Sequence, residues 1–377
     1  MIASLLASPG AVIMVVGALV GIASSLLGAF LVLRRSSMLA DAISHSVLLG
    51  IVVVFLLTRD HHSPWFILGA AAVGVLTVAL TELLASSKRV KIDAAIGLVF
   101  TFLFALAILL INLLARNVHI DTHAVLLGEI SFVWLDTTPL AGLEVPKALL
   151  SIGAVTLINA LFVTLFYKEL KLATFDPGLA AALGFSPTLI FYLLLSLTSI
   201  TAVTAFEAVG AILLIAFVIV PPAAGYLLTD RLWLMLLWGG LISIASSILG
   251  YLAAVALDAS ISGMMASVAG GFLALAFLAG PRYGLVAQEL RRRRSRFDNA
   301  ERMLLVHLYQ HEGQPGSQEE RRVAALASHL RWRPREISHL LQHSLDHGLV
   351  TRGPSDTLLL TPKGRVLAQE VLEPWRG

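Results

Sequence analysis

The sequence predicts an all-α polytopic membrane protein of about nine transmembrane helices (eight to ten), followed by a small cytoplasmic winged helix-turn-helix domain. The first observation is composition: 57% of the 377 residues are hydrophobic, 14% are charged and the mean hydropathy is +0.85. The second is a series of long apolar runs, and the third is an abrupt change of character at four consecutive arginines, residues 291–294. We therefore expect a transmembrane domain (1–285), a basic juxtamembrane linker (286–296) and a soluble domain (297–377).

Nine apolar runs are long enough, or nearly so, to cross a hydrocarbon core about 30 Å thick. They cover residues 11–33, 38–57, 64–85, 92–114, 147–167, 188–204, 207–228, 232–257 and 261–280. If these spans alternate, the connections rich in Lys and Arg fall on one side, which the positive-inside rule makes cytoplasmic. The N-terminus then lies outside and the C-terminal domain inside. We expect no cleaved signal peptide, because residues 1–10 lack a basic segment.

The second run contains an acid and an imidazole, Asp41 and His45. Their four-residue spacing places both side chains on one helical face, near the middle of the bilayer. An aspartate at that depth costs on the order of 3 kcal/mol, so it usually faces a cavity, a partner or an ion path. Carboxylate plus imidazole is a ligand pair for manganese, iron or zinc. The alternative is that the two groups hydrogen-bond each other or a neighbouring helix and hold the bundle in register.

The outward-facing parts of the chain carry further candidate ligands. His119, Asp121 and His123 lie in the long connection 115–146, and Glu207 begins the seventh run. They could be metal contacts at the outer mouth, or solvated loop residues and an acid at a helix start. Residues 125–130 predict a short helix at the outer surface. No cysteine occurs, so metal binding relies on oxygen and nitrogen ligands or on methionine.

The cytoplasmic connection between the fifth and sixth runs predicts a short capped helix over residues 177–183. Asp176 suits the N-cap, Pro177 the first helical position and Gly184 the left-handed position at the end. The helix leaves an apolar patch facing the cytoplasm, formed by Phe175, Leu179, Leu183 and Phe185. This patch could lie on lipid headgroups or dock on a partner protein.

The chain lacks a nucleotide-binding motif, and its seventh run contains two adjacent prolines. The chain has no G-x-x-x-x-G-K-[ST] phosphate loop, so we expect that it is not an ATPase. As a separate expectation, the chain is not an enzyme and has no catalytic residues. In the seventh run, Pro221 and Pro222 remove two backbone donors near the inner end. We expect a kink or an unwound turn there.

Residues 33–50, 171–187 and 207–231 resemble elements of the ABC-3 metal permeases, the membrane subunits of bacterial manganese, zinc and iron importers. The resemblance covers nearly the whole membrane part. It implies that Asp41 and His45 line the ion pathway. It also implies that an ATPase-coupling helix contains Phe175, Asp176, Pro177, Leu179, Leu183 and Gly184. The end of the segment 207–231 is similar to the subgroup that imports manganese or iron.

The same resemblance implies the partners and the cargo. We expect two copies of an ABC ATPase subunit, a second permease copy or a paralogous permease, and an extracytoplasmic metal-binding protein. The cargo would be Mn²⁺, with Zn²⁺ or Fe²⁺ as alternatives, and no cofactor would be bound permanently. The protein would be a multi-pass protein of the bacterial plasma (inner) membrane.

Residues 297–377 predict helices over about 298–311, 319–331 and 334–347, then a hairpin and a last helix, which is typical of a winged helix-turn-helix. Residues 360–368 resemble the DNA-binding domain of iron- and manganese-dependent repressors. The presumed recognition helix carries His339, His343 and His347, where DNA readers commonly have Arg or Lys. We therefore do not expect specific DNA binding. The histidines could instead bind a regulatory metal, or simply form an exposed polar face.

Two other functions compete with the importer hypothesis. The chain could be a membrane-tethered, metal-responsive DNA-binding regulator, although nine spans with an intramembrane Asp/His pair make a poor anchor. It could also be a siderophore or corrinoid permease, whose wide pore would lack paired metal ligands.

Overall fold

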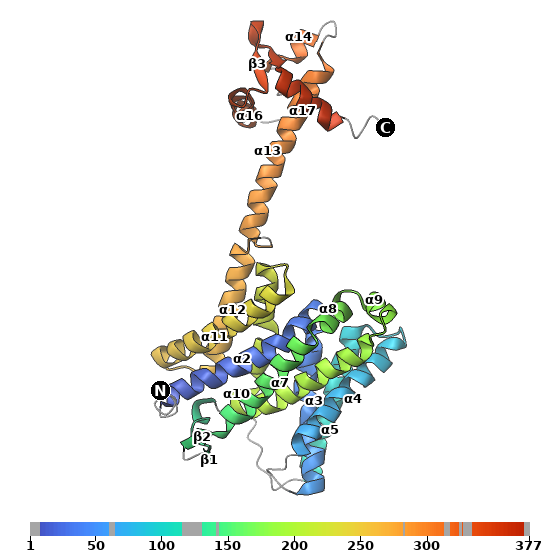
Figure 1. The fold of residues 1–377 in the computed structure, drawn as a ribbon, viewed down its shortest axis with the longest axis vertical. Helices are drawn as coiled ribbons and strands as arrows, with labels where there is room; N and C mark the ends of the chain where they lie inside the picture. The colour runs from blue at the N-terminus through green and yellow to red at the C-terminus, as the bar shows by residue number, and fades with distance from the viewer. Residues whose placement is uncertain are drawn as a thin grey trace. The chain divides into compact units, whose positions relative to one another are not determined.

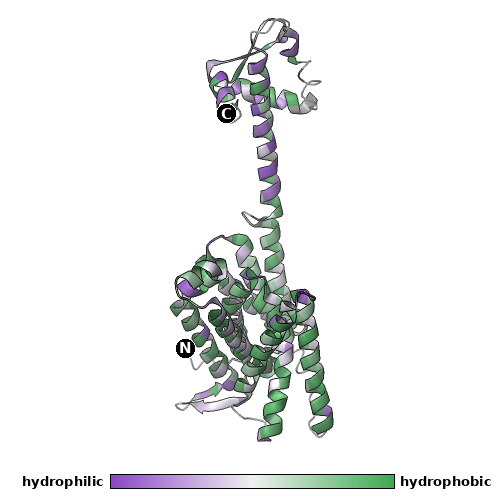
Figure 2. Ribbon diagram, turned by 90° about the vertical axis from the view of Figure 1, so that its right-hand side faces the viewer, coloured by the Kyte–Doolittle hydropathy of each residue, from purple (hydrophilic) through white to green (hydrophobic). Residues whose placement is uncertain are grey.

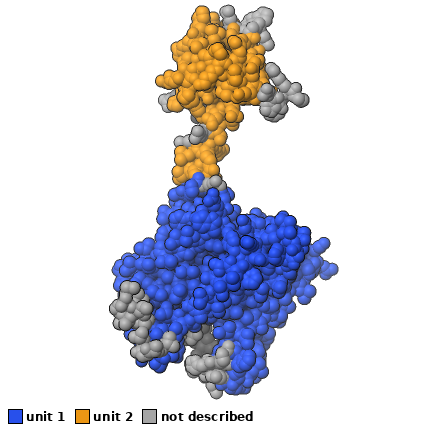
Figure 3. Space-filling model, viewed as in Figure 1, with its two compact units in different colours: residues 1–284 blue, residues 285–377 orange. Residues whose placement is uncertain are grey.

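The computed structural model describes residues 8–59, 65–114, 130–140, 143–281, 283–312, 317–323, 326 and 334–372. The chain divides into two compact units, Met1–Gly284 and Leu285–Gly377 (Figure 3). Each unit has its own hydrophobic core, so the two are described separately.

Unit 1 is a bundle of membrane-length helices, coloured mostly hydrophobic in Figure 2. They are α2 (Pro9–Leu33), α3 (Ser37–Thr58), α4 (Trp65–Ser86), α5 (Ile92–Leu114), α7 (Lys147–Leu165), α10 (Pro187–Leu228), α11 (Leu232–Leu257) and α12 (Ile261–Ala279). Because α10 contains two spans, Pro187–Phe206 and Ala208–Leu228, the described residues hold nine candidate spans. This confirms the nine predicted runs, whose ends all lie within a few residues of the observed ones.

The helix α10 is broken at Gly210, near the start of its second span, where a φ of 78° and a ψ of 171° are non-helical. This region of the backbone map is accessible in practice only to glycine. Of the kink or unwound turn expected at Pro221 and Pro222, the unwound turn is wrong, since the backbone keeps helical dihedrals through both residues.

The neighbouring helix explains why Pro222 is tolerated. A proline cannot donate to the carbonyl four residues earlier, which here is that of Val218. Gly28 of α2 packs so closely on that carbonyl that a Cβ on Gly28 would lie 1.9 Å from the Val218 oxygen. Such close approach lets Cα–H groups contact the freed oxygen, and it needs a residue without a side chain.

Helix α2 lies inside the bundle and packs against α10, α11 and α7. Buried polar groups link the helices, as expected where lipid supplies no hydrophobic driving force between them. Ser46 of α3 and Thr77 of α4 hydrogen-bond at 2.7 Å. Asn159 of α7 donates to Thr201 of α10 at 2.8 Å.

A short hairpin precedes α7. After the 3₁₀ turn η1 (Ile130–Phe132), β1 (Thr137–Leu140) pairs antiparallel with β2 (Leu143–Pro146), with Thr137 opposite Pro146. Figure 1 shows this hairpin at one end of the bundle and the short helices α8 (Tyr167–Phe175) and α9 (Pro177–Ala182) at the other. The hairpin of β1 and β2 was not predicted from the sequence, because each strand has only four residues and contains a proline. The short helix predicted at 125–130 lies, apart from Ile130, outside the described residues.

Unit 2 contains α13 (Leu285–Gln310), α14 (Ser317–Glu320), α16 (Pro334–Asp346), η2 (Pro354–Asp356), α17 (Pro362–Leu372) and the antiparallel pair β3 (Val350–Arg352) and β4 (Leu358–Leu360). Its core includes Leu305, Leu340 and Leu358. Residues 286–296, expected as a linker, are helical and form the first turns of α13. The helix predicted over 319–331 lies mostly outside the described residues.

Candidate functional site

Asp41 and His45 lie in the first turns of α3, just after a tight corner that joins α2 to α3. Arg35 in this corner has a φ of 57°. The Asp41 Oδ1 and His45 Nε2 atoms are 3.4 Å apart, and the two side chains are 35% and 29% exposed. The predicted common face is therefore observed, and both groups remain accessible from outside the chain's own core.

Two aromatic rings of α5 hold the imidazole of His45. Phe100 stacks on it with 5.7 Å between ring centroids, and Phe104 meets it edge-on at 6.0 Å. The sequence analysis missed these residues. Phe100 and Phe104 are four residues apart in an apolar run that also contains Phe102, which is 64% exposed. Without the position of α3, the sequence does not show which of these rings contact His45.

The separation of 3.4 Å suits a shared metal ion. An ion about 2.1 Å from both atoms would subtend roughly 108° between them, which is close to tetrahedral. The same geometry also makes an ion pair whenever the imidazole is protonated. Within the part of the chain that the structure describes, no three His, Cys, Asp or Glu side chains gather as a metal site. Among the described residues, one chain thus offers two donors at this pair.

The other candidate ligands of the membrane part are not brought to this pair by any described contact. His119, Asp121 and His123 lie outside the described residues. Glu207 lies in α10, three residues before the break at Gly210.

The predicted capped helix is present as α9, which ends one residue earlier than expected. Asp176 accepts a hydrogen bond from the Leu179 amide at 2.9 Å, and Pro177 occupies the first helical position. Gly184 has a φ of 86°, as its left-handed role requires. The apolar patch is exposed, with Phe175 and Leu183 each 60% accessible. Leu179 and Phe185 complete this patch, which we call the α9 patch.

A cluster that the sequence did not reveal lies where α10 begins. The Arg34 guanidinium sits 4.3 Å from the ring centroid of Phe191, and Tyr192 donates a 2.7 Å hydrogen bond to Glu82 of α4. Burial lowers the pKa of Arg34, and the nearby Glu82 carboxylate partly offsets this effect. The cluster joins the α2–α3 corner to α4 and to the first turns of α10.

His339 and His343 of α16, and His347 directly after it, do not converge on one point. His343 contacts Glu301 of α13 at 3.0 Å, and the same carboxylate oxygen accepts from Ser344 at 3.1 Å. The His347 ring stacks on that of His343, with 3.9 Å between centroids, while His339 meets the edge of Phe297. His339 and His347 are exposed, whereas His343 is half-buried against α13.

The fold and the site define a multi-pass membrane protein with a pair of potential metal ligands in an apolar bundle. Residues 11–280 match the ABC 3 transport family, and the chain belongs to this family. It is therefore a permease-type subunit of a bacterial membrane, as predicted.

Two relatives illustrate how far the similarity extends. The manganese transport system membrane protein MntD of Bacillus subtilis (strain 168) is 47% identical over 280 residues, which cover 74% of this chain and 95% of MntD. The zinc transport system membrane protein TroD of Treponema pallidum (strain Nichols) is 44% identical over 361 residues, 96% of this chain and 98% of TroD. The similarity to TroD thus includes most of unit 2.

A solved structure has the same membrane fold. PsaBC from Streptococcus pneumoniae, in complex with Fab, superposes with a TM-score of 0.62 at 27% identity. The match covers 75% of this chain and 98% of that chain.

Proposed function

We propose that the chain is the membrane-spanning permease subunit of an ATP-driven importer of a divalent transition metal. Manganese is the first candidate cargo, and zinc or iron are the alternatives. The observation that carries this proposal is the Asp41–His45 pair, 3.4 Å apart in an otherwise apolar helix. Family membership supports it, as do the names of MntD and TroD, which describe manganese and zinc transport systems.

The ligand count argues for a second permease, either a copy of this chain or a paralogue. Pairing about a two-fold axis would bring two carboxylates and two imidazoles to one ion. An extracytoplasmic metal-binding protein would deliver the metal to the outer mouth, where Glu207, His119, Asp121 and His123 are candidate contacts. The ion would be cargo and not a resident cofactor.

The energy would come from two copies of an ABC ATPase subunit, since this chain lacks a phosphate loop. The proposed docking element is α9. Its fixed caps and its exposed patch of Phe175, Leu179, Leu183 and Phe185 suit insertion into an apolar groove of a partner.

Unit 2 is proposed to be a cytoplasmic winged-helix domain similar to that of metal-dependent repressors. The order of α16, the β3–β4 hairpin and α17 supports this assignment. We propose that it adjusts transport and does not read a DNA sequence, because α16 presents histidines in place of a dense basic face.

The decisive experiment is ATP-dependent uptake of Mn²⁺, Zn²⁺ and Fe²⁺ by the complete assembly in proteoliposomes. Asp41→Asn and His45→Ala should each abolish uptake and leave assembly intact. Asp93→Asn, an exposed carboxylate in the first turn of α5, is the matched control and should transport normally. Normal uptake by both site variants would contradict the proposal.

A further inference from the structure

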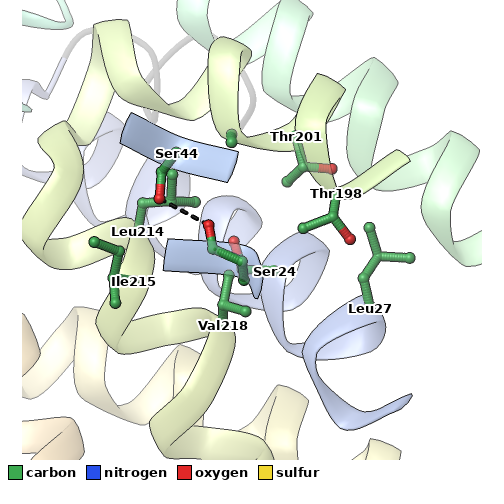
Figure 4. A pocket seen from close by; sticks show the side chains of 10 residues that line it. Ser24, Leu27, Ser44, Thr198, Thr201, Leu214, Ile215 and Val218 are labelled. Atoms are coloured by element: carbon green, nitrogen blue, oxygen red, sulfur yellow. Dashed lines mark hydrogen bonds between the residues drawn. The ribbon is translucent and has the colours of Figure 1, made fainter. Parts of the chain in front are cut away.

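A hydroxyl-lined pocket lies inside unit 1 among α2, α3 and α10 (Figure 4). Ser24 comes from α2, Ser44 from α3, and Thr198 and Thr201 from the first span of α10. Leu214 and Val218 close it from the second span, so the pocket touches both halves of α10. It has room for about one water-sized molecule. Neither Asp41 nor His45 lines it, so it is distinct from the candidate metal pair.

Three of the four hydroxyls offer only lone pairs to the pocket. Thr198 donates its single hydrogen to the carbonyl of Leu194 at 2.8 Å and Thr201 to that of Leu197 at 2.7 Å, each four residues earlier on the same helix. Ser44 also donates within its own helix, where the carbonyls of Ala40 at 2.8 Å and Asp41 at 2.9 Å are both acceptors. A hydroxyl has one donor and two acceptor sites, so acceptor capacity remains on all three. One of the two acceptor sites of Thr201 is already used by Asn159.

Ser24 is different. Its side chain is 1% exposed, and its Oγ has no hydrogen-bond partner among the described protein atoms. A buried hydroxyl without a partner costs about 1–3 kcal/mol. The pocket therefore combines a hydroxyl that can donate with three that can accept.

The chemistry of this lining selects its ligand. A water molecule can accept from Ser24 and donate to two of the other three hydroxyls, which gives it the 2–4 partners that buried waters need, about three on average. A cation would meet only neutral hydroxyl oxygens, and its buried charge would not be balanced, because no carboxylate occurs among the residues that line the pocket.

We propose that this pocket is a binding site for one internal water molecule, which joins α2, α3 and α10 inside the membrane. The Ser44 Oγ that faces the pocket also lies 2.9 Å from the backbone carbonyl oxygen of Asp41. The water is thus one hydrogen bond from the turn of α3 that carries the proposed metal ligand. Only this last consequence, that the water helps to position Asp41, rests on the proposed function.

Two neighbouring serines provide a matched test. Ser24 and Ser25 are both 1% exposed on α2 and both have an unpartnered Oγ, but only Ser24 lines the pocket. Ser24→Ala should lower the unfolding temperature of the purified permease by roughly 2–4 °C, since the water loses a partner. Ser25→Ala should leave it unchanged or raise it. If Ser24→Ala behaves like Ser25→Ala, the pocket is dry and the proposal is overturned.

Radiolytic footprinting provides a readout that does not depend on stability, because hydroxyl radicals formed from an ordered internal water oxidise adjacent side chains. Leu214 lines the pocket and is 2% exposed, whereas Leu213 is 0% exposed and does not line it. Leu214 should be labelled, Leu213 should not, and Ser24→Ala should remove the difference. Equal protection of both leucines in the unmodified protein would overturn the proposal. So would stability that depends on Na⁺ or K⁺ at constant ionic strength, since a cation would then occupy the pocket.

The positioning role is tested separately by metal binding. Ser24→Ala should weaken metal affinity several-fold, while Ser25→Ala should not. If Asp41→Asn leaves metal binding intact, the proposed function is contradicted. The unfolding temperatures of the Ser24 and Ser25 variants and the labelling of Leu214 would still decide whether the pocket binds water.

Discussion

At the scale of single residues, the imidazole of His45 contacts two aromatic rings as well as Asp41. Phe100 stacks against one face of the ring with the planes inclined by 28°. Such pairs contribute about 0.5–1.5 kcal/mol beyond the burial of their area. An imidazole held in one orientation presents its nitrogen to a metal with less loss of side-chain entropy.

Phe100→Ala should therefore weaken metal binding although it removes no ligand. We expect the half-saturating metal concentration for uptake to rise roughly 2- to 10-fold, in line with the energy of an aromatic pair. Phe102→Ala on the same helix is the control, because Phe102 is 64% exposed and should not matter. Equal effects of the two substitutions would show that the ring stacking does not position His45.

At the scale of secondary-structure elements, the passage of α10 through Pro221 and Pro222 depends on its contact with α2. Gly28→Ala should disrupt the bundle, since the new Cβ would lie 1.9 Å from the Val218 oxygen and backbone would have to move. We expect a large loss of folded protein in fluorescence-detected size-exclusion chromatography. Gly97→Ala in α5 has no atom within 4 Å of its new Cβ and should fold normally. Normal yield of the Gly28 variant would refute this view of the contact.

Helix α9 allows a test of coupling. The side chain of Leu179 belongs to the α9 patch, and this residue is 47% exposed. Leu179→Asp should prevent co-purification of the ATPase subunit or uncouple its hydrolysis from uptake. Leu135→Asp changes a residue that is 56% exposed near the hairpin, and it should leave coupling intact. If the Leu179 variant still couples ATP hydrolysis to uptake, α9 only connects α8 to α10 and does not dock on the ATPase subunit.

Hydropathy alone predicts the nine spans closely, because the length of an apolar run is a local property. The caps of α9 are also local, and Asp176 and Gly184 were assigned from sequence for this reason. The break at Gly210 was not predicted: the sequence places the boundary between the two runs at residues 205–206, and a glycine in an apolar run has many uses. The contacts of Phe100 with His45 and of Arg34 with Phe191 were not predicted, because each joins residues that are distant in the sequence.

At the scale of the whole molecule, the two units have separate cores. The core of unit 2 is formed by its own residues, from Phe297 to Ala368. Removing residues 297–377 should therefore leave an inserted, folded permease. The relative MntD is consistent with this expectation, because the 280 aligned residues cover 95% of MntD but only 74% of this chain.

The truncated protein should still transport metal, but its uptake should respond differently to metal loaded inside the vesicles. Uptake measured against internal Mn²⁺, for the truncated and full-length proteins in parallel, tests this. Identical responses would remove the regulatory role. Nanomolar binding of the full-length protein to one DNA sequence at physiological salt would instead favour a DNA-binding regulator.

The cluster around Arg34 has a mechanical consequence. Helix α10 starts four residues after Leu183, the C-cap of α9, and its first turns hold Arg34 through Phe191 and Glu82 through Tyr192. Any displacement of α9 that moves the start of α10 must either break these contacts or drag the α2–α3 corner with it. That corner precedes Asp41 by only a few residues, so these contacts connect the surface that carries α9 with the turn of α3 that holds Asp41.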